Sequence, residues 1–331
     1  MPCMFCGTDT DLTIEHVFPA FMGGELEVPV GSCSRHNGEI AVWEGKIKKD
    51  TALLLHLLLV ENRYGIVPNA KVDVAIPGVQ MSGLQGIREP SGTIKLFDKV
   101  REITREDGTK LRSGFFVSNK SAEKFLAKAK ERGEKIAERP AEEDITIDSS
   151  FLFTMAFCET PETRRVVAKI ALAAVAHEIG VGYAQSAQFD GLRHFCIDTS
   201  LPSSPVSYFS NKALVGALGC SVYQHSVIAY FSARQMKAWA VVTLFGGLTF
   251  AVQLTENYQE SSNRQFSIFY DAVSRKRFTP TLLANEMALV RLALSDESSF
   301  EDKKLLDEQW APLIQAYCAE RGIELGLIPP S

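Results

Sequence analysis

Two short pairs of metal-ligand residues, Cys3-Met-Phe-Cys6 and Cys33-Ser-Arg-His36, enclose the stretch of sequence that decides the fold of the N-terminal region. Each pair has two residues between its members, so each can lie on one tight turn and supply two adjacent corners of a tetrahedron. The spacing predicts one structural zinc ion held by three thiolates and one imidazole. Such an ion would hold a strand and a helix together in a module too small to build its own core.

A second signal lies between these pairs and directly after them. The segment Leu12-Thr-Ile-Glu-His-Val-Phe-Pro19 is followed by Gly23-Gly24, and Asn37 comes immediately after the second pair. Glu15 and His16 fall outside the zinc spacing, so their side chains are available for chemistry. A structural zinc finger needs neither a carboxylate, nor a further imidazole, nor an amide in one pocket.

In this order the residues resemble the HNH endonucleases, in the zinc-containing form of their ββα-metal fold. That family has an acidic residue or His, then His, a nearby Pro and Gly-Gly, and later a cysteine pair followed by Asn. The resemblance covers about the first 45 to 50 residues, with Glu15 in place of the commoner Asp or His and His36 in place of a cysteine. The segment Glu25-Leu-Glu-Val-Pro-Val-Gly31 lacks an Asn that helps orient the base in many members.

The resemblance implies a hydrolase acting on phosphodiester bonds, with catalytic residues His16, Glu15 and Asn37. A nuclease must deprotonate water and neutralise the charge that grows on the phosphate, which a histidine base and one divalent cation can do. By resemblance His16 is the general base, while Glu15 and Asn37 hold the cation. Their hard oxygen ligands favour Mg²⁺ or Mn²⁺, whereas Cys3, Cys6, Cys33 and His36 hold zinc.

The composition is that of an ordinary globular protein, with 46% hydrophobic and 23% charged residues in a chain of 331, which is long enough for two domains. No apolar run has the length of a membrane span, and no signal peptide precedes Cys3. The seven cysteines lack the regular spacing of a disulfide framework. We therefore expect a cytoplasmic protein.

The charge pattern leaves the partner open. The net charge is −5, yet residues 94–139 hold 13 Lys and Arg against 8 Asp and Glu. Because phosphate contacts dominate nucleic-acid affinity, this segment is the better candidate for tracking a nucleic-acid backbone, although a solvated helix face would have the same composition.

The predicted fold class is α+β, with an HNH nuclease module over residues 1–65 and a larger α+β domain over residues 66–331. Helical patterns cover residues 40–61, with a break near Gly45, and residues 121–138. The best helix follows Thr160-Pro161 and stops at Gly180. Further elements are a strand over 71–76, a hairpin over 94–118, an antiparallel region over 222–254 with a Gly-Gly turn, and a helical tail over 281–321.

The prediction is a metal-dependent endonuclease that cleaves nucleic acid, more readily DNA than RNA, with a second domain for substrate binding, dimerisation or control. By analogy with the family, such fusions serve in restriction or anti-phage defence. The alternative is a catalytically inactive zinc-binding module that recognises nucleic acid or protein. We assign structural roles to the remaining histidines, and to Arg193 an ion pair with a carboxylate; these histidines are His56, His177, His194 and His225.

Overall fold

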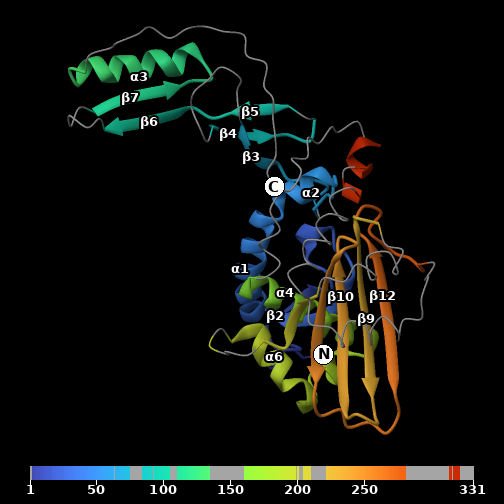
Figure 1. Cartoon of the computed structure of the whole chain (residues 1–331). Helices are drawn as coiled ribbons and strands as arrows, with labels where there is room; N and C mark the ends of the chain where they lie inside the picture. The colour runs from blue at the N-terminus through green and yellow to red at the C-terminus, as the bar shows by residue number, and fades with distance from the viewer. Residues whose placement is uncertain are drawn as a thin grey trace. The chain divides into compact units, whose positions relative to one another are not determined.

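The computed structural model combines helices with antiparallel sheets, as the predicted α+β class requires (Figure 1). It describes residues 2–62, 64–74, 84–91, 93–104, 110–134, 160–198, 200, 204–209, 221–280, 313–314 and 316–320. No helix within these residues is long and apolar enough to cross a lipid bilayer.

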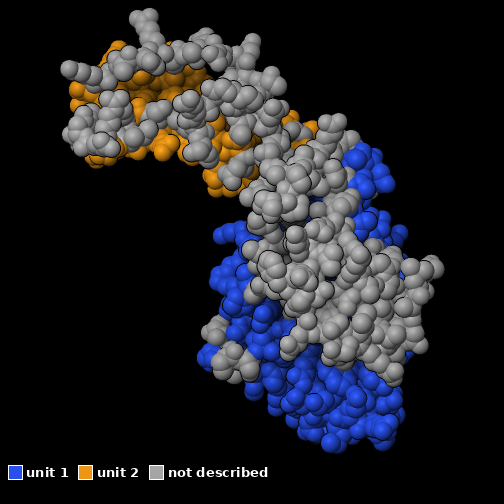
Figure 2. All heavy atoms as spheres, viewed as in Figure 1, with its two compact units in different colours: residues 1–68, 154–322 blue, residues 69–153, 323–331 orange. Residues whose placement is uncertain are grey.

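The chain divides into two compact units, coloured separately in Figure 2. Unit 1 contains residues 1–68 and 154–322, and unit 2 contains residues 69–153 and 323–331. The first division, after Pro68, lies close to the predicted boundary at residue 65. The prediction placed residues 66–331 together in one second domain. In the structure, residues 154–322 group instead with residues 1–68 in unit 1.

The N-terminal segment is a β-hairpin followed by a helix. Strand β1 (Leu12–His16) pairs antiparallel with β2 (Glu27–Cys33), and the helix α1 (Ser34–Asp50) packs against both strands. The connection between the strands contains the short helix η1 (Ala20–Met22), and a second helix, α2 (Ala52–Leu57), follows α1. The expected helix break lies at Thr51 rather than at Gly45.

Helix α4 (Pro161–Glu178) is the central element of unit 1. Thr160 caps it, since its hydroxyl accepts the Thr163 N–H at 3.2 Å, and Pro161 is its first residue, as predicted. The helix packs against α1 and β2 and also against the large sheet. Its side chains from Val166 to Ala176 are therefore buried all round, whereas the sequence predicted a single buried stripe.

Six strands of the described chain form one antiparallel sheet in the order β13-β12-β9-β10-β11-β8. The predicted turn at Gly246-Gly247 joins β10 to β11, but the two positive φ values belong to Phe245 and Gly246, at 51° and 66°. The turn thus lies one residue earlier than predicted. The strands are β8 (Val206–Phe209), β9 (Gln224–Ser232), β10 (Lys237–Leu244), β11 (Leu248–Thr255), β12 (Arg264–Asp271) and β13 (Lys276–Arg277).

Three short helices complete the described part of unit 1 beside α4: α5 (Val181–Ala184), η3 (Ala187–Phe189) and α6 (Asp190–Ile197). In α6, Arg193 pairs with Asp190, which confirms its predicted structural role. Of the predicted helical tail, the structure describes helical residues at 313–314 and 316–319, where the Tyr317 hydroxyl donates to the Leu58 carbonyl at 3.0 Å. The rest of that prediction lies outside the described residues.

The described part of unit 2 consists of hairpins and one helix. Strands β3, β4 and β5 form one antiparallel sheet, while β6 and β7 pair separately as predicted; their predicted Glu106-Asp107-Gly108 turn lies outside the described residues. Helix α3 is capped by Ser118 and ends earlier than the predicted residue 138. The elements are β3 (Ala70–Val74), β4 (Leu84–Arg88), β5 (Ile94–Leu96), β6 (Lys99–Thr104), β7 (Lys110–Phe115) and α3 (Asn119–Glu131).

Candidate metal centre and neighbouring polar site

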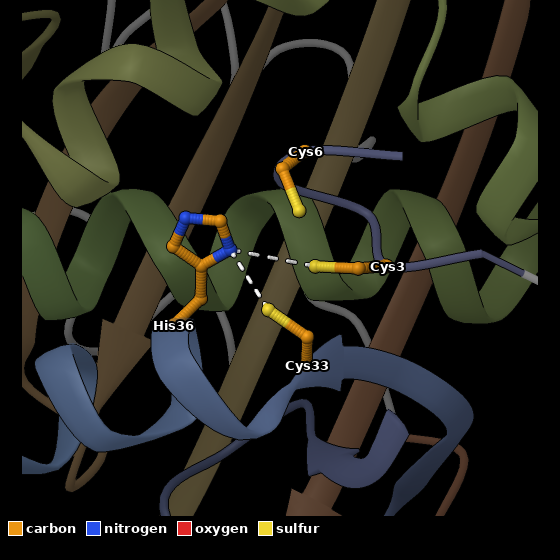
Figure 3. A group of neighbouring side chains, drawn as sticks. All are labelled: Cys3, Cys6, Cys33 and His36. Carbon is orange, nitrogen blue, oxygen red and sulfur yellow. Dashed lines mark hydrogen bonds between the residues drawn. The ribbon is translucent and has the colours of Figure 1, made fainter. Parts of the chain in front are cut away.

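The four predicted zinc ligands converge on one point (Figure 3). The Sγ atoms of Cys3, Cys6 and Cys33 and one ring nitrogen of His36 all lie within 4.8 Å of one another. Ligands about 2.3 Å from a tetrahedral zinc ion are roughly 3.8 Å apart, so this cluster can close around one ion with small movements. Within the described residues, no other group of three or more His, Cys, Asp and Glu side chains is this compact.

Local backbone structure places each pair of ligands. The first pair lies on a turn in which the Gly7 N–H donates to the Cys3 carbonyl at 2.8 Å, and Gly7 has a φ of 77° that favours glycine. The Met4 N–H donates to the Gly31 carbonyl at 2.9 Å, which fastens this turn to β2. The second pair lies where β2 ends and α1 begins, with Cys33 at the N-cap position of the helix.

The electrostatics of the cluster suit a thiolate–imidazole metal site. Burial raises the pKa of Cys3 to about 11, so an uncompensated thiolate is unfavourable there. Burial also raises the pKa of Cys33. Hydrogen bonds from backbone N–H groups in the first turn of α1 and from the neighbouring thiols outweigh this effect, so the pKa of Cys33 lies below its usual value. A bound cation would provide the charge that buried thiolates need.

His36 is oriented on both sides of its ring. Nδ1 faces the thiols, 3.3 Å from Sγ of Cys33 and 3.6 Å from Sγ of Cys3, and burial lowers the pKa of the imidazole. Nε2 lies 3.3 Å from a guanidinium nitrogen of Arg35 and 4.0 Å from a carboxylate oxygen of Glu39, which is beyond hydrogen-bond distance. A carboxylate that accepts a hydrogen bond from a ligating histidine is a common support at zinc sites, and Glu39 would have to move closer to provide it.

The predicted catalytic residues lie on the same hairpin and helix. Glu15 and His16 are the last two residues of β1, and Asn37 lies in the first turn of α1. The side chain of Glu15 is buried, whereas those of His16 and Asn37 are half-buried. The β1–β2 pairing is irregular between Thr13 and Glu15, not between Glu15 and His16, so these two neighbours keep the opposite orientations of consecutive strand residues.

A lysine far away in sequence lies beside Glu15. Nζ of Lys169, on α4, lies 2.6 Å from Oε1 of Glu15 and 3.3 Å from Oε1 of Glu44 on α1, and it donates to the His16 carbonyl at 2.7 Å. Burial lowers the pKa of Lys169, but the two carboxylates raise it more, so the side chain is a buried ammonium. Burial raises the pKa of Glu44 despite the ammonium beside it.

The ammonium therefore contacts the carboxylate that the resemblance makes a ligand of the divalent cation. Glu15 still has a free ligand atom, because its Oε2 is buried and has no hydrogen-bond partner among the described residues. That orphaned oxygen fits a metal ligand. No pattern in the sequence assigns Lys169 or Glu44 to this site.

Three of the four histidines predicted to be structural have backbone partners. His56 contacts the Pro68 carbonyl through Nδ1 at 2.9 Å, and His177 contacts the Glu27 carbonyl at the same distance. His225 is fully buried; its Nε2 donates to the Met22 carbonyl at 3.2 Å and its Nδ1 accepts the Phe245 N–H at 3.1 Å. These contacts give the three residues structural roles.

The basic segment of unit 2 forms β6, β7 and α3. Lys120, Lys124 and Lys128 are exposed and four residues apart on α3, so they follow one face of the helix at intervals of about 6 Å. In contrast, Arg112 and Lys110 of β7 pair with Glu102 of β6. The row on α3 is the part of this segment best suited to phosphate groups.

Comparisons with protein-family models, with curated proteins and with solved structures find no match to this chain.

Proposed function

We propose that unit 1 is a metal-dependent endonuclease of the HNH type that hydrolyses phosphodiester bonds, with DNA as its preferred substrate. The observation that carries the proposal is the placement of His16. Its main chain is tied to Glu15 and to Lys169, while its half-buried side chain leaves the end of β1 on the side opposite to the Glu15 side chain, whose carboxylate has one orphaned oxygen. Hydrolysis of a phosphodiester needs a base held in a fixed position, and the contacts to the His16 main chain support that role.

In this proposal His16 takes the proton from the attacking water. Glu15 Oε2 and the Asn37 side chain would hold Mg²⁺ or Mn²⁺, which when bound supplies Lewis-acid stabilisation of the charge on the phosphate. The cluster of Cys3, Cys6, Cys33 and His36 binds zinc and keeps β2 and α1 in register with the N-terminal turn. In unit 2, the lysines of α3 contact the nucleic-acid backbone without reading its sequence.

The contact between Glu15 and Lys169 favours a second candidate, a zinc-binding module without catalytic activity. A carboxylate already neutralised by an ammonium at 2.6 Å needs no metal ion. The module would then recognise nucleic acid through its basic surface and use the charged pair as structural support.

Incubation of the purified full chain with supercoiled plasmid, single-stranded DNA and RNA separates the two candidates. Each substrate is tested with Mg²⁺, with Mn²⁺ and with EDTA, and His16→Ala serves as the inactive control. Cleavage that requires added metal and is absent from His16→Ala supports the endonuclease. Binding without cleavage under every condition supports the inactive module.

A further inference from the structure

We propose that Lys169 is a positioning residue for His16, so that residues 154–322 complete the nuclease site begun by the N-terminal hairpin. The inference rests on the proposed function, since it names what places the base. It also answers how His16 is oriented in a segment that lacks the Asn found before the second ligand pair in many HNH proteins.

Every N–H donor of the Lys169 ammonium has an acceptor within reach. The group has three N–H donors, and three acceptors lie within 3.3 Å of it: Oε1 of Glu15, Oε1 of Glu44 and the carbonyl of His16. Burying an ammonium is unfavourable unless it is paired and hydrogen-bonded. An apolar side chain would fill this place at lower cost, so the lysine points to a requirement for these contacts.

The contacts close a ring around the main chain of His16. Its N–H donates to Oε1 of Glu15 at 3.1 Å, the same oxygen contacts Nζ of Lys169, and Nζ donates to the His16 carbonyl. Both peptide groups that flank the His16 Cα are thus held by one charged pair. The ring fixes the direction in which the imidazole leaves the strand.

The packing around Glu15 leaves its side chain little room to move. A Cβ added at Gly31 of β2 would lie 2.7 Å from Cβ of Glu15. Glycine at this position therefore allows Glu15 to lie tightly against the neighbouring strand while its carboxylate reaches Lys169. Strand β2 thus limits the Cβ of Glu15, and Lys169 of α4 holds its carboxylate.

Helix α4 also supplies a matched control. Arg165 lies one turn before Lys169 and is buried like it, but its guanidinium donates to the carbonyls of Phe195 and Asp198 and lies over the rings of Phe195 and of Trp43 in α1. Lys169→Met and Arg165→Met each remove one buried cation from the same helix, and only the first removes a contact to His16.

The test combines NMR spectroscopy and kinetics on the full chain. In Lys169→Met we expect a shift of the His16 carbonyl ¹³C resonance, faster exchange of the His16 amide, and a kcat reduced at least tenfold with KM changed less than twofold. Arg165→Met should leave the His16 signals and kcat close to those of the wild type. Unchanged His16 signals in Lys169→Met, or equal changes in both variants, would overturn the proposal.

Two further comparisons separate a folding defect from the loss of the Lys169 contact, and the positioning role from the proposed function. If Lys169→Met does not fold, the double variant Glu15→Gln/Lys169→Met removes both charges, and its His16 carbonyl resonance must still shift because the donor is gone. If the wild type cleaves no nucleic acid but the His16 signals respond as expected, the anchoring of His16 is upheld and the proposed function fails. If the wild type cleaves and Lys169→Met keeps full kcat, the function stands and the positioning role fails.

Discussion

Nζ of Lys169 lies 2.6 Å from Oε1 of Glu15, in a part of unit 1 where both side chains are buried. This pair joins helix α4 to the hairpin whose second strand ends at Cys33 of the candidate metal cluster, so the N-terminal segment does not form its core alone. Other contacts have the same effect. Lys46 of α1 pairs with Glu162 of α4 at 2.6 Å, and the Tyr270 hydroxyl of β12 donates to the Gly23 carbonyl at 2.9 Å.

Loss of a zinc ligand should destabilise all of unit 1. In Cys33→Ala we expect the zinc content to fall from about one per chain to near zero, measured by mass spectrometry, and unit 1 to unfold at lower temperature. Unit 2 should keep its structure because it contains none of the ligands. Cys196→Ala is the control, since Cys196 is buried in α6 outside the cluster. Full zinc content in Cys33→Ala would contradict the site.

Replacement of the proposed base should affect chemistry alone. His16→Ala is expected to reduce the cleavage rate by about 10² to 10⁴ while thermal stability and nucleic-acid affinity stay near those of the wild type. His194→Ala, at an exposed histidine of α6, should cleave normally. Equal cleavage by His16→Ala and the wild type would remove His16 from the mechanism.

The catalytic metal should be separable from the structural one. Asn37→Ala removes an amide oxygen without touching a zinc ligand, so we expect it to raise the Mg²⁺ or Mn²⁺ concentration needed for half-maximal cleavage. Zinc content should remain near one per chain, because thiolates hold zinc far more tightly than an amide and a carboxylate hold Mg²⁺. An unchanged metal requirement would show that Asn37 is not a ligand.

His225 should make unit 1 sensitive to acid. Burial lowers the pKa of His225 to about 4, whereas an unfolded histidine titrates near 6.5. The unfolded chain therefore binds a proton first as the pH falls, and stability decreases between pH 6.5 and pH 4 by up to about 3 kcal/mol from this residue. Chemical denaturation at several pH values measures the effect.

The control for this pH dependence is His225→Gln, which keeps a hydrogen-bonding side chain but cannot titrate. Carboxylates also titrate in this range, so the difference between wild type and variant isolates the histidine. A constant difference from pH 7 to pH 4 would contradict a buried neutral His225.

The lysine row of α3 should account for part of any nucleic-acid affinity. Changing Lys120, Lys124 and Lys128 together to alanine is expected to weaken binding at low salt regardless of sequence. The slope of log affinity against log salt should become shallower by up to about one per lysine, because fewer counterions are released on binding. Fluorescence anisotropy across a salt series measures both quantities.

An equal change in basic charge elsewhere provides the comparison for that measurement. Alanine at three basic positions of unit 1 should leave the salt slope unchanged; these are Arg234, Lys237 and Lys276. If both triple variants lose affinity equally, net charge rather than the α3 row governs binding.

The sequence by itself determined the features that depend on residues close together along the chain. Ligand spacing identified Cys3, Cys6, Cys33 and His36, because two residues between ligands fit one turn. Thr160 and Pro161 located the start of α4, because capping is a local hydrogen bond. The antiparallel strands around Gly246 followed from their apolar runs and the turn, though the turn's position was one residue off.

Only the tertiary structure decided what lies next to Glu15 and His16. Lys169 is 153 residues from His16 in the sequence, and no local pattern places its ammonium against the hairpin. The same holds for the division of the chain, where residues 154–322 belong to the same unit as residues 1–68 although residues 69–153 come between them in the sequence. Hydrophobic periodicity predicts which side chains are buried. Which residues these side chains then contact depends on packing between segments that are distant in the sequence, and no local pattern encodes that packing.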